Sequence, residues 1–342
     1  MGFFKKFVKA VTDPVTIVTA VALVLTAGTI GTLGTFASFA VYAGATAAIS
    51  ALSPTPEMPT FGGYGSFVSE ARSRTQMIKQ PAQPRRVVYG EVRVSGVLVF
   101  AETTNNDEFI HLVIAVAGHE IDSFQTFRID EDTVTLTNTE VTAPSRFLDG
   151  STKLVNIYTK TGADNQTAQT QLVADVTNWT SNHRMRGIAY IYAKLKFSSD
   201  AFPNGLPNIS SKIRGKKVFD PRTSNSAFSS NPALCIRDYL TDTRYGLGCS
   251  ASEIDDTSFI AAANTCEEQV TLAAGGNQNR YELHGSFDSS FAPKEIIEKM
   301  LKSCGGILTY TNGKFRLRVA EFRTPSVTLT EDDIRDTIKL SP

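Results

Sequence analysis

The side chains that most often do chemistry in proteins are present in this chain, but their spacing builds no recognisable site. The 342 residues contain no HExxH, GxSxG, Walker A or dinucleotide-binding motif. The four cysteines form no CxxC pair, and no two histidines stand four residues apart, as zinc ligands on one helix would. The sequence therefore predicts no metal, no cofactor and no catalytic centre, and hence a protein that is not an enzyme.

Neighbouring carboxylates still invite an acid–base interpretation. Two such pairs are Asp255–Asp256 and Asp332–Asp333, and each stands where a helical pattern begins. Negative side chains are favourable at the N-terminus of a helix, where they interact with the helix dipole. We therefore interpret both pairs as helix caps rather than as catalytic groups.

The strongest local charge is a basic run, which contains Lys212, Arg214, Lys216, Lys217 and Arg222. In a strand, the first three would lie on one face. Several cations on one surface could contact the phosphates of DNA. A solvated strand face, or ion pairs between subunits, is the interpretation that we favour. The run thus provides candidate lumen or interface residues.

Composition gives no overall electrostatic preference. There are 34 Lys and Arg residues against 34 Asp and Glu, so no global field attracts nucleic acid or an acidic membrane. The length suffices for two or three domains. The widely spaced cysteines predict buried free thiols, as in a protein folded in a reducing cytoplasm.

An uncharged stretch from Pro14 to Pro54 follows the N-terminal lysines. It is long enough to cross a bilayer, which takes about 20 apolar residues, although its glycine-rich centre (28–34) could divide it into a helical hairpin. The apolar run is too long for a signal peptide. A membrane anchor and an assembly helix buried among its own copies both remain open. The candidate axial or membrane-contacting residues are Leu23, Leu25, Phe36, Phe39 and Tyr42.

After a Pro-, Gly- and Ser-rich connector (57–84), the pattern becomes that of an antiparallel β meander. Apolar runs and turns predict strands within 87–100, 109–117 and 121–129. A region rich in Thr, Asn and Asp follows, with short strands expected at 134–136, 154–158 and 172–176. A clear alternating strand covers 185–197.

The last third of the chain combines helices with a hairpin. Asn231 is predicted to cap a helix that has Pro232 in its first position. A third helix, 293–304, is expected to stop at two glycines, and an Asn-Gly turn at 312–313 predicts a β-hairpin. A second helix begins near Asp256 and places four residues on one face: Phe259, Ala263, Cys266 and Val270.

Several of these segments resemble, residue by residue, short sequence segments of one protein family. They read VYGEVRVSG at 88–96, HLVIAVAGHEI at 111–121, RGKKVFDPR at 214–222, NPAL at 231–234 and YTNGKFRL at 310–317. In this form the chain resembles the central hub, or tail-tip, proteins of long-tailed bacteriophages, the group that includes the lambda host-specificity protein J. The resemblance extends over roughly residues 89–333. It places His119 and Glu120 in an ordinary hub strand and loop.

The resemblance implies a mainly β fold with α+β modules, in which tail-tube-like hub β-barrels follow an N-terminal apolar helical segment. The expected domains are that segment (1–56), a linker (57–84), a first hub barrel (85–130 and 182–225), a small β insertion (131–181) and a second, tube-like α+β domain (226–342). In relatives the chain normally continues beyond this point.

The resemblance also implies a structural virion protein, assembled in the host cytoplasm and located at the tail tip. It would form a homotrimeric hub that caps the tail tube, contacts the distal tail, tape measure and tail fibre proteins, and opens for DNA ejection. DNA would meet it only in passage, and the host membrane only on ejection. The alternative from the sequence is a membrane-anchored β-rich protein of the bacterial envelope, and a cell-wall hydrolase is a distant third.

Overall fold

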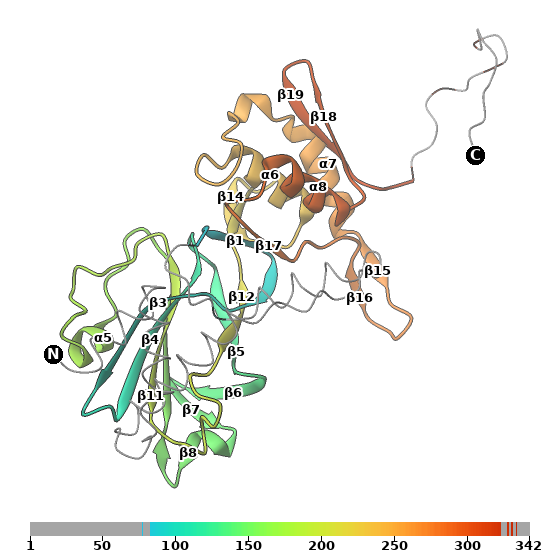
Figure 1. Ribbon diagram of the computed structural model, residues 1–342. Helices are drawn as coiled ribbons and strands as arrows, with labels where there is room; N and C mark the ends of the chain where they lie inside the picture. The colour runs from blue at the N-terminus through green and yellow to red at the C-terminus, as the bar shows by residue number, and fades with distance from the viewer. Residues whose placement is uncertain (1–76, 78–82, 323–326, 328–329, 331–332, 334–342) are drawn as a thin grey trace, which may run out of the picture.

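The computed structural model describes residues 77, 83–322, 327, 330 and 333. The predicted helical segment (1–56), with its candidates Leu23, Leu25, Phe36, Phe39 and Tyr42, lies outside these residues. The described part is mainly β, as predicted, and Figure 1 shows it as a lobe built on a large sheet and a second lobe that contains most of the helices. Among the described residues, no helix is both long and apolar enough to cross a bilayer.

A nine-stranded antiparallel sheet forms the first lobe. Its strand order is β2-β12-β5-β6-β7-β10-β11-β4-β3. The strands are β2 (Glu91–Val94), β3 (Val97–Thr104), β4 (Phe109–Ala117), β5 (Ser123–Ile129), β6 (Asp132–Thr137), β7 (Glu140–Ala143), β10 (Val155–Lys160), β11 (Ala189–Lys196) and β12 (Ile209–Arg214). The predicted insertion 131–181 thus contributes β6, β7 and β10 to the same sheet as the flanking segments.

The sheet is curled because its two edge strands follow each other in the chain. β2 and β3 lie at opposite edges, yet only Ser95 and Gly96 separate them. This corner is tightly packed: Ser95 Oγ donates a hydrogen bond to the carbonyl of Ile209 (2.5 Å), and a Cβ on Gly96 would lie 2.0 Å from the carbonyl oxygen of Ala115. Glycine is therefore required where the chain turns from one edge of the sheet to the other.

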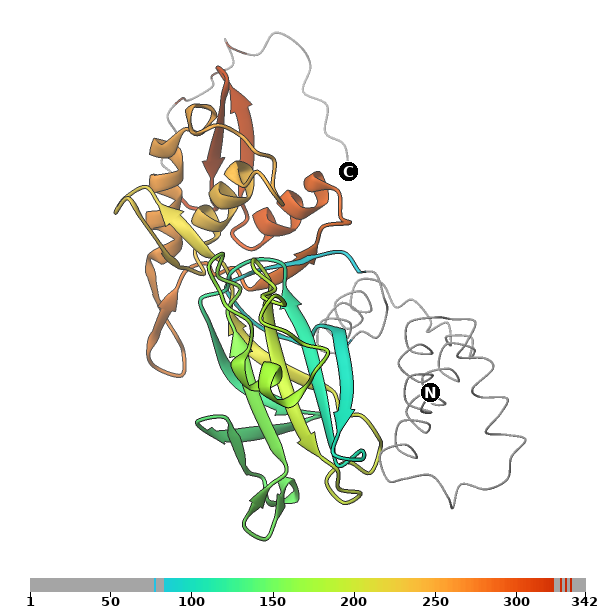
Figure 2. The same cartoon turned by 90° about the vertical axis from the view of Figure 1, so that its left-hand side faces the viewer.

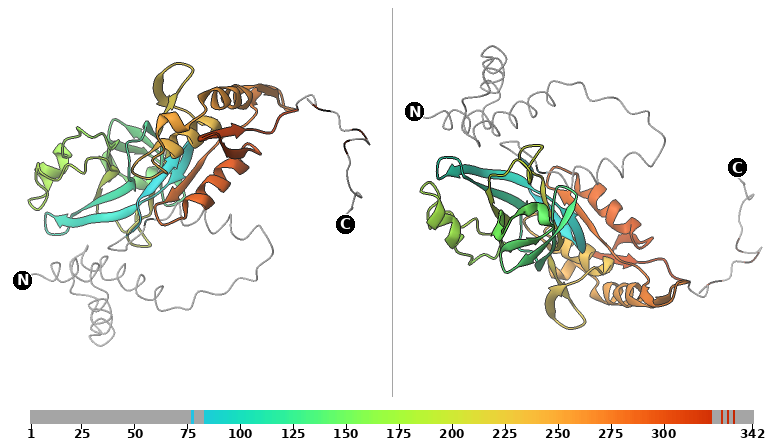
Figure 3. Two further views of the ribbon diagram at one scale, coloured as in Figure 1. Left: turned by 90° about the horizontal axis from the view of Figure 1, so that it is seen from above. Right: turned by 90° about the horizontal axis from the view of Figure 1, so that it is seen from below.

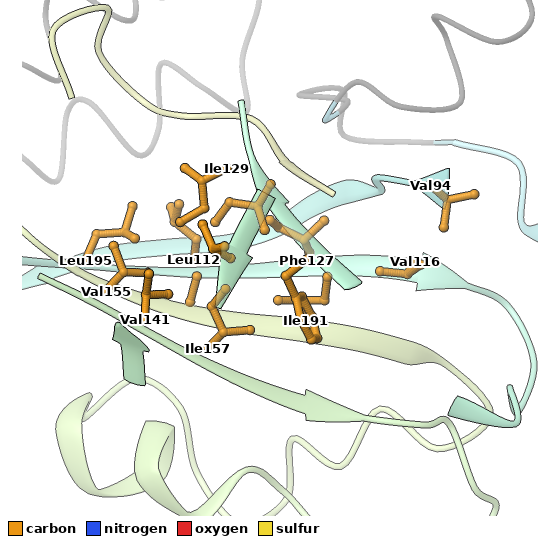
Figure 4. Close-up of a cluster of buried hydrophobic side chains, with 14 of the residues drawn as sticks. Val94, Leu112, Val116, Phe127, Ile129, Val141, Val155, Ile157, Ile191 and Leu195 are labelled. Carbon is orange, nitrogen blue, oxygen red and sulfur yellow. The ribbon is translucent and has the colours of Figure 1, made fainter. Parts of the chain in front are cut away.

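The inside of the curl is the main hydrophobic core. Apolar side chains that alternate along the strands meet there, as Figure 4 shows for Leu112, Phe127, Ile157, Ile191 and Leu195. All five are buried. The alternation that predicted the strands is therefore the pattern that fills this core.

The outer face of β4 and β11 is covered by the segment between β10 and β11. This segment contains one helix, α5 (Thr170–Asp175), so the prediction of a strand at 172–176 is wrong. Leu172 of α5 and Val176, the residue that ends this helix, pack with Tyr190 and Tyr192. Smaller elements at the far end of the sheet are η2 (Ser145–Phe147), β8 (Leu148–Asp149) and β9 (Thr152–Lys153).

Three helices and several two-stranded sheets build the second lobe, which Figures 2 and 3 show beside the sheet lobe from three further directions. The three helices are α6 (Pro232–Thr241), α7 (Asp256–Glu267) and α8 (Pro293–Lys302), and a short 3-10 helix, η3 (Ala251–Glu253), precedes α7. The strand pairs are β13 (Lys217–Asp220) with β14 (Asn225–Phe228), β15 (Gln269–Thr271) with β16 (Asn277–Asn279), and β18 (Ile307–Thr311) with β19 (Lys314–Arg318).

Most local predictions for this lobe are confirmed. Asn231 caps α6, accepting a hydrogen bond from the N–H of Ala233 (3.0 Å), and the Asn-Gly turn joins β18 to β19. Val270 is a correction, because α7 ends at Glu267 and Val270 lies exposed in β15. The buried face of α7 includes the other three expected residues, Phe259, Ala263 and Cys266.

One strand connects the two lobes. β1 (Arg86–Tyr89) pairs with β17 (Gly285–Asp288), which precedes α8. Val88 packs in the core of the sheet lobe, whereas Val87 and Tyr89 point the other way, into the core of the helical lobe. The alternation of a strand thus gives one residue to one core and two to the other.

Candidate functional site

A group of hydrogen-bonded and largely buried charges lies at the junction, by which we mean β1, the basic run 212–222 and α6. Lys216 is at its centre, and 18% of its side chain is exposed. Its Nζ donates to Oδ2 of Asp238 (2.6 Å) and to Oδ2 of Asp242. Tyr89 Oη also donates to Asp238 (2.5 Å). One ammonium thus holds a carboxylate from the last turn of α6 and the carboxylate of the residue that ends this helix.

Burial and charge act against each other in this group. Burial works to lower the pKa of Lys216, but the attraction and hydrogen bonds of Asp238 and Asp242 outweigh it and leave the pKa raised. Burial also raises the pKa of Tyr89, and the nearby carboxylate of Asp238 adds to this rise. Lys216 is therefore a charged structural group and Tyr89 a neutral hydrogen-bond donor.

The remaining cations of the basic run also have acidic partners within the same chain. Glu91 of β2 receives both Lys212 (2.6 Å) and Arg214 (2.9 Å), whose hydrogen bonds lower its pKa. Lys217 lies 3.5 Å from Glu120, which belongs to the loop after β4. The contacts of Glu91 connect neighbouring strands of the sheet lobe, and that of Lys217 connects β13 of the helical lobe to a loop of the sheet lobe.

Arg222 forms the most complete of these ion pairs. Its guanidinium donates to Asp220 (2.8 Å) and to both oxygens of Glu267 (2.6 and 2.9 Å). Asn231, the cap of α6, donates to the same carboxylate (2.9 Å). A bidentate contact, in which a guanidinium donates two hydrogen bonds to one carboxylate, is among the strongest polar interactions in proteins. The end of the run is therefore fixed to both α6 and α7.

His119 is a structural residue of the junction. Its Nε2 accepts a hydrogen bond from the N–H of Val88 (2.9 Å), and its Nδ1 donates to the carbonyl of Glu120 (2.7 Å). Both contacts require the neutral ring with the proton on Nδ1. Burial lowers the pKa of His119 to about 4, which keeps this form at neutral pH. The ring supports β1 and leaves no nitrogen free for acid–base catalysis.

A second buried histidine belongs to a network on the outer face of the sheet. Tyr192 Oη donates to Asp175 (3.0 Å), so His111 Nδ1 donates to Tyr192 (2.8 Å). The other nitrogen of His111 accepts from Thr104 Oγ1 (2.8 Å), and Lys194 completes the network on Asp175 (3.1 Å). Burial lowers the pKa of His111 to about 4. This network fastens α5 to β4 and β11.

The expected carboxylate caps are partly a correction. Asp255 stands at the N-cap position of α7 but makes no side-chain cap hydrogen bond. It pairs instead with Arg316 of β19 (2.9 Å), and Asp256 pairs with Arg237 of α6 (2.7 Å). Both carboxylates therefore connect α7 to its neighbours. Within the described residues, no group of three or more His, Cys, Asp or Glu side chains could hold a metal ion.

The ion pairs of the basic run limit its ability to bind the phosphates of DNA. In the structure all five of its cations contact carboxylates of the same chain, which reduces their attraction for phosphate. The sequence could not reveal this, because Lys216 and Asp238, or Arg222 and Glu267, are distant in the chain. Whether the run faces a lumen or another subunit stays a prediction.

Comparison with known proteins agrees with the resemblance of the sequence segments described above. The chain is 25% identical over 307 residues to the baseplate hub protein pb3 of Escherichia phage T5, across 70% of this chain. It is 24% identical over 181 residues to the tip attachment protein J of Escherichia phage SECphi27, across 48% of this chain. The chain is similar to phage tail-tip hub proteins, so the predicted resemblance is confirmed. By their names, both relatives are components of a phage tail tip or baseplate.

The extent of these matches is limited on the side of the relatives. The chain spans 32% of the length of pb3 and 15% of the length of the J protein. No protein-family model matches it. Among solved structures, a chain in the virion of a native gene transfer agent has a TM-score of 0.45 and 14% identity, covering 76% of this chain and 59% of that one.

Proposed function

We propose that this chain is a structural subunit of a phage tail-tip hub, in which it works by holding other tail components in place rather than by catalysis. The observation that carries the proposal is the similarity to the hub protein pb3 over 70% of the chain. The names of both relatives describe parts of a tail tip or baseplate.

The junction supports a mechanical role. β1 takes part in both cores, and the buried group of Lys216, Asp238 and Asp242 lies between the strand and α6. Buried ion pairs with good geometry hold their partners in one arrangement, because separating them leaves a charge without compensation. The two lobes would therefore move as one body when the hub is loaded.

The finer parts of the proposal concern assembly. The hub would be a homotrimer whose tube-like β domains cap the tail tube and meet the distal tail protein, the tape measure protein and the tail fibre proteins. It would open for DNA ejection, with DNA only in passage and the host membrane contacted at that stage. The curled sheet is compatible with a tube-like barrel, because its edge strands already meet at the Ser95–Gly96 corner.

Labelled virions provide the test. A short epitope tag at the C-terminus of this chain, in a phage that encodes it, should place antibody-bound gold at the distal end of the tail. Quantitative mass spectrometry of the same particles should give three copies per virion. Gold on the capsid, or particles that lack the chain, would disprove the proposed location, and a copy number other than three would disprove the trimer.

A further inference from the structure

Two exposed arginines outside the basic run, Arg85, which precedes β1, and Arg244, contact Tyr245 in the loop after α6. A third exposed arginine, Arg186, precedes β11 and stands next to Gly187, against which Arg244 rests. Among the described residues none of the three forms an ion pair, in contrast to all five cations of the basic run. The folded chain thus leaves the positive charge of this site uncompensated by direct contact.

The arginines come from distant parts of the chain and meet at two points. Arg85 Nη1 donates to Tyr245 Oη (3.3 Å), and the guanidinium of Arg244 lies over the Tyr245 ring, 5.1 Å from its centre. A Cβ on Gly187 would lie only 3.2 Å from Nη1 of Arg244, so this arginine rests against the turn that carries Arg186. We call Arg85, Arg186, Arg244 and Tyr245 the arginine cluster.

Hydrogen bonds to residues of the junction and of the loop after β4 fix the position of Tyr245 in the cluster. Tyr245 Oη donates to the carbonyl of Gly118 (2.7 Å), and the N–H groups of Arg244 and Tyr245 donate to Asp242 (2.7 and 2.9 Å). Asp242 is itself bound by Lys216. Tyr245 is therefore positioned by hydrogen bonds to Gly118 and Asp242, while Arg85, Arg186 and Arg244 remain exposed.

We propose that the arginine cluster is a protein-docking surface, and that its partner is an acidic segment of a neighbouring tail protein. Arginine pairs with carboxylates through two parallel hydrogen bonds, and Arg and Tyr are enriched among residues that dominate binding energy at protein interfaces. The proposal rests on the proposed hub function, because it assigns one of the contacts that a hub must make.

The surroundings favour a protein partner over DNA. Leu247, two residues from Tyr245, is 41% exposed, so the surface combines cations with apolar area, as interfaces between proteins do. The carboxylate of Asp164 also lies nearby, 3.8 Å from the position of a Cβ on Gly187. A negative group beside the arginines weakens attraction for phosphate, whereas a protein partner with both kinds of side chain can accommodate it.

Binding of two polyanions by the full-length chain tests the proposal. The probes are fluorescent poly-L-glutamate and a short DNA duplex, followed by anisotropy at low and at physiological ionic strength. In the variant R85Q/R186Q/R244Q, the affinity for poly-L-glutamate should fall about tenfold, since two or three carboxylate contacts are lost. The affinity for the duplex should change less.

A matched control removes equal charge from the outer end of the helical lobe, in the variant K302Q/K314Q/R318Q. It should bind poly-L-glutamate as the wild type does. The single variant R186Q serves if the triple variant is unstable, because Arg186 is exposed and its side chain makes no hydrogen bond or ion pair with any residue that the structure describes. An unchanged affinity, or an equal loss in the control, would overturn the proposal, and a larger loss for the duplex would assign the cluster to nucleic acid. Gold labelling at the tail tip is independent of all these outcomes.

Discussion

At the scale of single residues, Lys216 is the charge whose loss should matter most. In the variant K216M, Asp238 and Asp242 would stay buried without their common cation. Removing one partner of a buried ion pair typically costs about 3–5 kcal/mol, so the free energy of unfolding in urea should fall by this amount. The control is K212M, because the side chain of Lys212 is 50% exposed and such pairs contribute about 0–1 kcal/mol. Equal effects of the two substitutions would contradict a structural role for Lys216.

His119 gives the junction a pH dependence. Its pKa is about 4 in the folded chain against 6.5 for an unperturbed histidine, so between these values the unfolded chain binds more protons. Stability should therefore decrease as pH falls from about 6.5 to about 4, by about 2 kcal/mol at pH 5 for this residue. The variant H119Q keeps a hydrogen-bond acceptor for Val88 but does not titrate.

Urea unfolding at pH 7.5 and pH 5 measures this effect. The loss of stability between the two pH values should be smaller in H119Q than in the wild type by about 2 kcal/mol. His111, with a similarly lowered pKa, should account for a comparable part of the remainder. H183Q is the matched control, because His183 is an exposed residue, in contrast to His119. If H119Q kept the full dependence, His119 would have to be protonated in the folded chain.

At the scale of elements, the corner between β2 and β3 determines how the sheet curls. The variant G96A would place a Cβ 2.0 Å from the carbonyl oxygen of Ala115, so either β3 or β4 must shift. Overpacking of this kind costs about 1–3 kcal/mol, and we expect the unfolding temperature to fall accordingly. G285A, in β17, should be nearly neutral, because no atom of the described part of the chain lies within 4 Å of its Cβ position. A neutral G96A would show that the corner is not closely packed.

Elements with strong local signals could be predicted from the sequence, and those defined by distant partners could not. The cap at Asn231 and the Asn-Gly turn at 312–313 identified α6 and the β18–β19 hairpin correctly. The sequence predicts a strand at Leu172, where the structure has α5. A helix of six residues has fewer than two turns, so its apolar residues do not repeat often enough to distinguish a helical pattern from that of a strand. The partners of the basic run were hidden for a different reason, since ion pairs such as Arg222 with Glu267 depend on tertiary folding.

At the scale of the whole molecule, β1 decides whether the two lobes are independent. It stands before the sheet lobe in the chain, but it pairs with β17 and gives Val87 and Tyr89 to the core of the helical lobe. The predicted division at residues 225 and 226 separates the helical lobe from this strand. A fragment that begins at 226 would therefore expose the edge of β17, part of a core, and the carboxylate of Asp238 without Tyr89 or Lys216.

We expect the fragment 226–322 to lack a cooperative thermal transition, whereas 83–322 should unfold in a single one. A third fragment consists of 226–322 with residues 84–90 fused to its N-terminus through a flexible linker. It should recover part of the fold, because it restores the β1–β17 pair. Circular dichroism and amide hydrogen exchange distinguish these outcomes, since a missing strand leaves β17 unprotected. If 226–322 alone folded as stably as the fused fragment, β1 would be a minor contact, and the lobes could move separately when the hub is loaded.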